Sequence, residues 1–451
     1  MSSKQFSKPK PGGARLLAYD LITQVNRGGA YANLRLPELL DNSDLELRDR
    51  AFATELAYGT LRMQGKHDYA ISKNADRPFS ELDEKIVDLL RLGIHQIFEM
   101  RVPIHAAVGE TVEVARAVAG ESKASYVNAI LRSISTDLEI YERLEKDESI
   151  SNLEKLAILH SHPTWIISAY YDQLKDWDAV IELLKVNNVP VAPHIIAWPG
   201  KSTVAEILEV GGTKLALGTF SVLSDHLPNE YPAIKDKRAG IQDMGSQLIS
   251  ETFFATRTSN AKEWLDLCAG PGGKAALLNN LLAQSDEAYE FLANEPSEHR
   301  AELVARVVPR SKIVSNDGRN FESFGKKFDR ILIDAPCSGL GALRRRPEAR
   351  WRRTLGDLKE LLPLQRELID SAYEMLNPGG IIAFATCSPL LAETKGQVLD
   401  AQYRHKDLML LDISQFSPAG NVGVNDDGTL QLWTHIEGSD SMFMALLQKS
   451  K

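Results

Sequence analysis

The first third of the chain carries its apolar residues at a helical period. A helix that ends at Gly28 places Leu17, Leu21 and Val25 on one face. Similar patterns predict further helices at 46–64, 80–99, 104–118 and 123–134. We therefore predict that residues 1–140 form an all-α domain. Nothing in this region indicates catalysis, so we expect it to dock onto a partner or to bind RNA.

A polar stretch at 136–154 separates this region from a shorter segment of mixed character. In that segment the apolar spacing predicts helices at 162–174, 177–186 and 204–212, and a strand at 192–200. We interpret residues 150–235 as a small α/β unit that precedes the last domain.

From residue 262 onward, short apolar runs alternate with helical patterns. The runs predict strands at 263–267, 289–295, 312–317, 330–334 and 381–386. The intervening patterns predict helices at 273–283, 297–307, 357–376 and 391–403. This alternation is typical of a doubly wound α/β sheet. We place the domain at 237–451 and expect two antiparallel edge strands, 430–435 and 441–449, at its end.

The strand predicted at 330–334 delivers an acid and a thiol together. Asp334 ends the apolar run, and Cys337 follows it within the segment FDRILIDAPCSGLG at 328–341. Ligands of open α/β sheets bind beyond the carboxyl ends of the strands, so both side chains should face such a crevice. Taken alone, the segment fits equally well a buried aspartate that caps a turn and a cysteine that fills space.

The loop after the first strand of this domain indicates a cofactor. Residues 266–274 read DLCAGPGGK, in which glycines let the backbone approach a ligand and a helix N-terminus favours a carboxylate. Glu295 follows the second strand, where an acid can bind ribose hydroxyls, and Asp317 follows the third, where it can accept from an adenine amino group. The loop is neither a P-loop nor a full dinucleotide fingerprint. Together these features predict a site for S-adenosylmethionine.

Two cysteines should emerge at the same edge of the sheet. Cys337 follows one predicted strand and Cys387 follows another, within Thr386-Cys387-Ser388. The chain has three cysteines in all, each of them after a predicted strand. Two thiols beside an acid and a methyl donor indicate methylation at C5 of a pyrimidine. A thiolate that adds to C6 makes C5 nucleophilic enough to take the methyl group, and a base then removes the C5 proton.

Composition narrows the classes of protein. Hydrophobic residues make up 43% of the 451 residues and charged residues 25%, which are ordinary globular values. Three cysteines in a chain of this length indicate a reducing compartment, and no apolar run is long enough for a membrane span. We expect a cytoplasmic monomer that binds neither metal nor membrane.

The net charge of −9 argues against a broad, sequence-independent grip on nucleic acid. Two segments are nevertheless locally basic. We interpret residues 1–10 as a flexible tail. Residues 344–353, RRRPEARWRR, combine six arginines with a tryptophan close to the crevice strand, which favours a loop that contacts phosphates. We predict that Arg345, Arg346 and Arg350 bind RNA.

These motifs carry a resemblance to a known family. CAGPGGK, IDAPCSGLG, RRRPEARWRR and TCS, in this order, resemble the RNA (cytosine-5) methyltransferases of the NOL1/NOP2/Sun family. VPIHAAVGETVEVA and VNAILRSI resemble the NusB-like domain fused to bacterial members, among which those that act on 16S rRNA are the most similar. The resemblance covers almost the whole chain. It implies a Rossmann-like methyltransferase core behind an all-α NusB-like, RNA-binding domain.

The resemblance also implies roles for individual residues. Cys387 would be the nucleophile, Cys337 would assist release of the product, and Asp334 would meet N3 of the target base. The cofactor-binding residues that it implies are Cys268, Ala269, Gly270, Pro271, Gly272, Gly273, Lys274, Glu295, Asp317 and Asp334.

Three positions depart from the family pattern. Glu393-Thr394 stands where an Glu-Asn pair is usual, Asp440 to Phe443 reads DSMF instead of DGFF, and Glu295 replaces an aspartate. None of them alters a thiol, so they bear on the RNA target more than on the reaction. Two alternatives to an rRNA methyltransferase stay open. One is a tRNA (cytosine-5) methyltransferase, and the other is a non-catalytic, RNA-binding factor in ribosome assembly.

Overall fold

A computed structural model describes residues 12–451, so the basic tail predicted at 1–10 lies outside the described residues. By their internal contacts these residues fall into two units. One, here called the helical unit, comprises residues 12–168 and Arg345–Arg352. The other, the sheet unit, comprises Ala169–Arg344 and Arg353–Lys451. No helix within 12–451 is long and apolar enough to cross a membrane.

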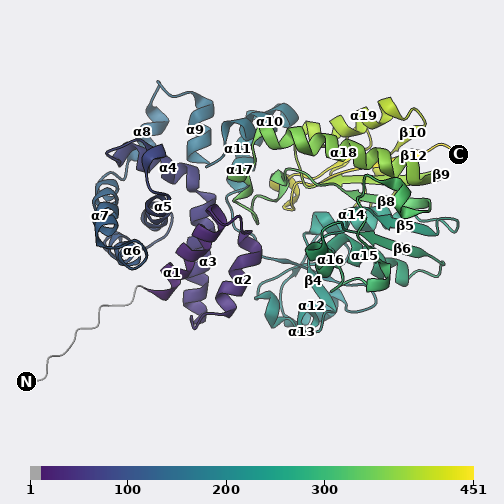
Figure 1. Ribbon diagram of the computed structural model, residues 1–451, viewed down its shortest axis with the longest axis horizontal. Helices are drawn as coiled ribbons and strands as arrows, with labels where there is room; N and C mark the ends of the chain where they lie inside the picture. The colour runs from purple at the N-terminus through teal and green to yellow at the C-terminus, as the bar shows by residue number, and fades with distance from the viewer. Residues whose placement is uncertain (1–11) are drawn as a thin grey trace, which may run out of the picture. The chain divides into compact units, whose positions relative to one another are not determined.

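The helical unit is built around one apolar core (Figure 1). Its helices are α1 (Gly13–Asn26), α2 (Ala32–Asp41), α3 (Leu47–Arg62), α4 (Gln64–Asn74), α5 (Glu84–Phe98), α6 (Ile104–Ala119), α7 (Glu121–Ser135), α8 (Ile140–Lys146) and α9 (Asn152–Leu159). Helix α5 lies at the centre, with Leu89, Leu90 and Ile94 fully shielded from solvent. The unit extends beyond the predicted boundary at 140 because α8 buries Ile140 and Leu144.

A short segment from late in the chain also belongs to this unit. Arg345–Arg352, whose end forms α17 (Ala349–Arg352), packs among residues of α1 to α4 and the loops beside them. The chain therefore leaves the sheet unit after Arg344 and returns to it at Arg353. Periodicity along the sequence carries no signal for such an exchange, because the segment is short and its partners lie some 300 residues earlier.

The sheet unit begins with a small antiparallel sheet, ordered β2-β3-β1-β4. Its strands are β1 (His194–Ala197), β2 (Thr213–Lys214), β3 (Ser221–Leu223) and β4 (Ala239–Ile241). Helices α10 (Thr164–Leu174), α11 (Trp177–Val186), α12 (Val204–Val210) and α13 (Pro232–Lys235) precede or interrupt these strands. Ile195, Val222 and Tyr231 form their shared core.

The large sheet has the order β10-β12-β9-β8-β5-β6-β7, and β11 pairs with β12 alone. Its strands are β5 (Glu263–Asp266), β6 (Glu290–Asn294), β7 (Ile313–Val314), β8 (Phe328–Asp334), β9 (Leu376–Thr386), β10 (Leu408–Leu411), β11 (Leu430–Gln431) and β12 (Phe443–Lys449). The five strands from β9 to β7 in this order run parallel, as the sequence predicts. Strand β12 is antiparallel to both of its neighbours, β9 and β10.

Helices cover both faces of this sheet (Figure 1). On one face pack α14 (Met244–Ala255) and α15 (Gly273–Ala283), and on the other α18 (Leu355–Met375) and α19 (Lys395–Arg404). Helix α16 (Glu298–Val304) lies between β6 and β7 in the chain. Because successive strand residues face opposite ways, Leu332 joins one core while Ile331 and Ile333 join the other.

Three local predictions differ from the structure. The third parallel strand ends at Val314, so Asp317 lies in the loop beyond it. Strand β12 is internal rather than an edge, because the unpredicted strand β10 pairs along its outer side. Residues 430–435 contribute two strand residues and then begin the short helix α20 (Thr434–Glu437).

Candidate active site

The strand order reverses between β5 and β8. From β5 the chain proceeds outward to β6 and β7, and it then returns to β8 on the other side of β5. At such a switch point the loops part and leave a crevice beyond the carboxyl ends of the strands. Asp266 ends β5 and Asp334 ends β8, so both acids border this crevice. Burial, and then the nearby Asp334 carboxylate, raise the pKa of Asp266 to about 8.

Lys274 forms an ion pair with one of these acids. Its Nζ lies 2.9 Å from Oδ2 of Asp334. Burial disfavours the charged ammonium, but attraction to Asp334, followed by attraction to Cys387, raises the pKa of Lys274 overall. The ammonium therefore stays charged and acts on both Asp334 and Cys387. Lys274 was predicted only as part of the cofactor loop, and the structure adds this second set of partners.

The two predicted thiols meet beyond the carboxyl ends of β8 and β9. Sγ of Cys337 lies 3.5 Å from Sγ of Cys387; both cysteines are partly buried and neither forms a disulfide. The hydrogen bond with Cys387, together with burial, raises the pKa of Cys337 well above its usual range. Cys337 therefore keeps its proton and can donate it to the sulfur of Cys387. The structure thus brings together two residues that are fifty positions apart in the sequence.

A buried glutamate clamps the two cysteine loops together. Glu393 is fully shielded from solvent. Its Oε1 accepts from the Ser338 backbone N–H at 2.7 Å, and its Oε2 accepts from the Ser338 and Ser388 hydroxyls at 2.5 and 2.6 Å. Gln365 of α18 donates to Oε1 at 3.2 Å and to the Pro336 carbonyl at 2.8 Å. Each serine directly follows one of the cysteines, so this network sets the distance between the thiols.

The backbone after Cys337 is also held against the second cysteine loop. The N–H of Gly341 donates to the Cys387 carbonyl at 2.9 Å, and its carbonyl accepts from the Ser441 N–H at 2.9 Å. A Cβ at Gly341 would lie 2.1 Å from the Ser441 carbonyl oxygen, so only glycine fits there. Ser441 belongs to the segment Asp440 to Phe443, and this departure from the family pattern therefore borders the cysteine loops.

Glu295 is held beside the predicted cofactor loop. It is almost fully buried, and its carboxylate accepts from the Gly270 N–H at 3.1 Å and from the Ser297 N–H at 3.0 Å. Arg300 lies 3.3 Å from the same carboxylate and donates to the Gly270 carbonyl at 2.6 Å. The loop from Cys268 to Lys274 is thus tied at its middle to the end of β6. This placement fits the predicted ribose contact.

Asp317 differs in being half exposed. Hydrogen bonds from Arg319 lower its pKa to about 2, so it remains a carboxylate that can accept from a ligand. A stronger sign of a ligand is Asp266, whose Oδ2 is buried without a hydrogen-bond partner among the described residues. At neutral pH a carboxyl group with a pKa of about 8 is mostly protonated, so Oδ2 of Asp266 can donate as well as accept. A buried polar atom without a partner is expected where a bound ligand completes the network, so the residues present fit a cofactor with polar groups. No cluster of three metal-ligating side chains occurs within 12–451.

One of the three arginines predicted to bind RNA, Arg350, has a structural role instead. Arg350 is fully buried, and its guanidinium donates to the backbone carbonyls of Arg62 and Ser161. It therefore has no surface to offer to RNA phosphates, because it satisfies carbonyls at the ends of helices in the helical unit. Arg345 and Arg346 are partly exposed, and Arg346 lies over the ring of Tyr31, 5.8 Å from its centroid.

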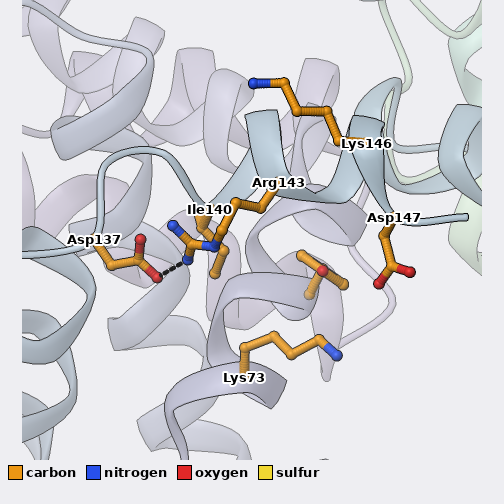
Figure 2. Close-up of a pocket in the computed structure, with 7 residues that line it drawn as sticks. Lys73, Asp137, Ile140, Arg143, Lys146 and Asp147 are labelled. Carbon is orange, nitrogen blue, oxygen red and sulfur yellow. Dashed lines mark hydrogen bonds and ion pairs between the residues drawn. The ribbon is translucent and has the colours of Figure 1, made fainter. Parts of the chain in front are cut away.

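The helical unit contains a hollow of about 520 Å³. Figure 2 shows the side chains that line it, and the Arg143 guanidinium is turned toward Asp137. The lining residues are Tyr69, Lys73, Asp137, Ile140, Arg143, Lys146 and Asp147. No ion pair is recorded for Lys73 or Lys146 within residues 12–451, although the Lys73 ammonium lies over the ring of Tyr69. None of the residues predicted for the site lies here.

Sequence reasoning overlooked two functional groups. Glu393 was noted only as part of a motif that departs from the family pattern, although an acid six residues after Cys387, within the helix predicted at 391–403, was the available signal. Asp266 was read as the start of the loop, and its place at a strand end beside Asp334 was the signal there. In both cases the role depends on burial, which the sequence does not display.

Two family models match the chain. The model described as 16S rRNA methyltransferase RsmB/F covers residues 254–448, and that of the NusB family covers 13–136. Among solved structures, that of PH0851 aligns with 99% of this chain and all of its own, with a TM-score of 0.79 and 21% identity. A methyltransferase homologue from Pyrococcus horikoshii aligns with 66% of this chain and all of its own, with a TM-score of 0.54 and 19% identity. These likenesses confirm the predicted fold.

Curated relatives are closer in sequence. Putative methyltransferase Rv1407 of Mycobacterium tuberculosis is 42% identical across 97% of this chain and 96% of its own. Ribosomal RNA small subunit methyltransferase B of Vibrio vulnificus is 30% identical across 85% of this chain and 89% of its own. The chain therefore belongs to the RsmB/F family of 16S rRNA methyltransferases, and its first domain belongs to the NusB family.

Proposed function

We propose that this protein methylates C5 of a cytosine in 16S rRNA through a covalent adduct with Cys387. The observation that carries the proposal is the pair of thiols, 3.5 Å apart, beside the Lys274–Asp334 ion pair at the switch point of the sheet. The methyltransferase family supports S-adenosylmethionine as the cofactor, which supplies an electrophilic methyl group when it is bound. Glu295, Asp317, Asp334 and the loop 268–274 would hold it.

Cys387 is the better nucleophile of the two thiols. The charged Lys274 attracts negative charge on its sulfur, and Cys337 can donate a hydrogen bond to the same atom. Both interactions favour a thiolate at Cys387. Addition of that thiolate to C6 of the base makes C5 nucleophilic toward the methyl group. The target base must first leave its stack, which favours single-stranded or looped RNA.

The Lys274–Asp334 ion pair and the Cys337 thiol then take part in the proton transfers. As Cys387 adds, N3 of the base takes up a proton from solvent, and Asp334, whose position Lys274 holds, accepts a hydrogen bond from the new N3–H. Cys337 no longer donates to the sulfur of Cys387 and loses its own proton to solvent. After methyl transfer, the Cys337 thiolate removes the C5 proton while the bond between Cys387 and C6 breaks. Both sulfurs return to their initial states, and the N3 proton leaves as the single proton that methylation releases. A high pKa suits Cys337 to this task, because it makes the thiolate a strong base.

Substitution of each cysteine should have a different effect on the reaction. Cys387→Ala should abolish methylation without a covalent adduct, whereas Cys337→Ala should permit methyl transfer and leave the protein crosslinked to RNA. A denaturing gel of each variant with RNA and cofactor measures this directly, beside the wild-type protein treated in the same way. An adduct in Cys387→Ala and none in Cys337→Ala would reverse the two roles.

The target class can be tested independently of the mechanism. Bisulfite sequencing of total RNA from cells with and without the gene should show one cytosine of 16S rRNA that loses its methyl group. Loss of methylation in a tRNA instead would identify the alternative substrate. Unchanged methylation in all RNA, with normal ribosome assembly lost, would favour the non-catalytic factor.

We further propose that the helical unit docks rRNA at the hollow formed by α4, α8 and the loops beside them. Lys73 and Lys146 form no ion pair in the described part of the chain, so their charges are available to phosphates, and Tyr69 offers an aromatic ring beside Lys73. Arg143 is already engaged by Asp137, and it would contribute less. Cations around a ring suit an unpaired nucleotide with its phosphates.

A further inference from the structure

One buried side chain borders the cofactor loop from outside the large sheet. Gln242 lies between β4 and α14 and exposes 7% of its surface. Its backbone is fixed at both ends, because its N–H donates to the His194 carbonyl at 3.0 Å and its carbonyl accepts from Gln247 Nε2 at 2.9 Å. The side-chain amide therefore has a defined direction.

Only half of that amide is satisfied. Its Nε2 donates to Oγ of Ser246 at 3.1 Å. Its Oε1 is buried and has no hydrogen-bond partner among the described residues. A buried acceptor without a donor is destabilising, so such a group in a fixed position indicates a donor that arrives from elsewhere.

The side chain of Gln242 packs against the start of α15, at the end of the predicted cofactor loop, with its amide carbon and Nε2 closer to the Cβ position of Gly273 than its Oε1 is. The three heavy atoms closest to the position of a Cβ on Gly273 all belong to Gln242, and the nearest is its amide carbon at 3.6 Å. Gly273 is the first residue of α15, whose free N–H groups favour a carboxylate. Glu295 and Asp317, which suit the adenosine part of the cofactor, instead follow β6 and β7.

We propose that Oε1 of Gln242 accepts a hydrogen bond from the α-ammonium group at the methionine end of S-adenosylmethionine. This inference rests on the proposed function, because it presupposes that cofactor. In an amino acid the ammonium and carboxylate share one carbon, so a carboxylate drawn to the N-terminus of α15 brings the ammonium to the same end of the loop. Gln242 then supplies the acceptor that the N–H groups of the helix cannot.

Calorimetry can measure separately how Gln242 affects binding of the amino-acid end and of the adenosine end of the cofactor. Wild type and Gln242→Leu are titrated with S-adenosylmethionine and with 5′-methylthioadenosine, which lacks the amino-acid end. The variant should bind S-adenosylmethionine roughly tenfold to hundredfold more weakly, as expected for one lost hydrogen bond to a charged group. Its affinity for 5′-methylthioadenosine should stay within about twofold of wild type. Equal weakening toward both ligands would overturn the assignment.

The matched control is Gln397→Leu. Gln397 exposes the same 7% of its surface and also has a buried, unpartnered Oε1, but it lies in α19. It should bind both ligands as wild type does. The melting temperatures of the two ligand-free variants should change to a similar extent, because each variant loses one unsatisfied buried acceptor and one amide donor that makes a hydrogen bond. A larger fall in Gln242→Leu would indicate a structural role instead.

A second variant shows whether Gln242 accepts or donates the hydrogen bond to the cofactor. Gln242→Glu keeps an acceptor and adds charge, so it should bind S-adenosylmethionine at least as tightly as wild type. If it binds more weakly than Gln242→Leu, the amide is a donor to the α-carboxylate, and the ammonium assignment is overturned. If wild type binds neither S-adenosylmethionine nor 5′-methylthioadenosine, the proposed cofactor itself is wrong.

Discussion

The clamp at Glu393 offers the most direct test of how this fold holds two thiols together. The conservative change Glu393→Gln keeps the shape of the side chain and removes its charge. Both serine hydroxyls can rotate to accept from the new amide, so the network loses charge assistance more than contacts. We expect the free energy of unfolding to fall by about 1–2 kcal/mol.

Glu393→Ala should be more damaging, and the structure gives the reason. Four donors converge on the carboxylate from Ser338, Ser388 and Gln365. The two hydroxyls lie 3.3 Å apart and can bond to each other, which leaves one hydroxyl hydrogen, the Ser338 N–H and one Gln365 amide hydrogen without an acceptor. At about 1–3 kcal/mol for each of these three stranded donors, the loss is about 3–9 kcal/mol.

Urea unfolding measures these losses, with Glu360→Gln on an exposed face of α18 as the control. The thiol geometry is measured separately, in a Cys268→Ser background, by the rate at which mild oxidant joins Cys337 to Cys387. The sulfurs must approach from 3.5 Å to about 2 Å, so a loosened clamp should slow this reaction. If stability falls while the oxidation rate stays at the wild-type value, the clamp does not position the thiols and our reasoning is refuted.

Three further expectations concern the helical unit. His67 and His95 are buried with all four ring nitrogens unpaired among the described residues, and burial lowers both pKa values, that of His95 to about 3. Stability should therefore fall as the pH drops below about 6.5, because protons bind the unfolded state more tightly. His95 alone should contribute about 2 kcal/mol to the fall at pH 5, and His95→Leu should reduce the pH dependence measured by urea unfolding. Arg350→Met should lower the free energy of unfolding by about 2–4 kcal/mol, since it strands two buried carbonyls, whereas unchanged stability with weaker RNA binding would restore the predicted phosphate contact. Neutralising Lys73 and Lys146 should make the slope of log K for RNA binding against log salt concentration shallower by roughly 1.4. Lys123→Gln, which removes a lysine already paired with Asp83, should change this slope less.

The sequence by itself determined the elements and the edge at which the chemistry gathers. Helical and strand periods are local properties, so the five parallel strands and helices α1, α3, α5, α6 and α7 could be predicted from short windows, whereas the shorter α2, α4, α8 and α9 were missed. The carboxyl ends of parallel strands meet at one edge, and for that reason Cys337 and Cys387 could be placed together across fifty residues. The loop 268–274 and the acid at Glu295 followed from the same rule.

Tertiary structure decided what each polar group touches. Glu393 is a clamp because the fold buries it between two loops, and Lys274 reaches Asp334 because β5 and β8 are neighbours. Arg350 was predicted to meet RNA from its charge, yet packing places its segment inside the helical unit, where backbone carbonyls take its hydrogens. Charge and spacing identify groups able to bind a partner. Which partner they meet depends on contacts between distant segments, and these arise only when the chain has packed.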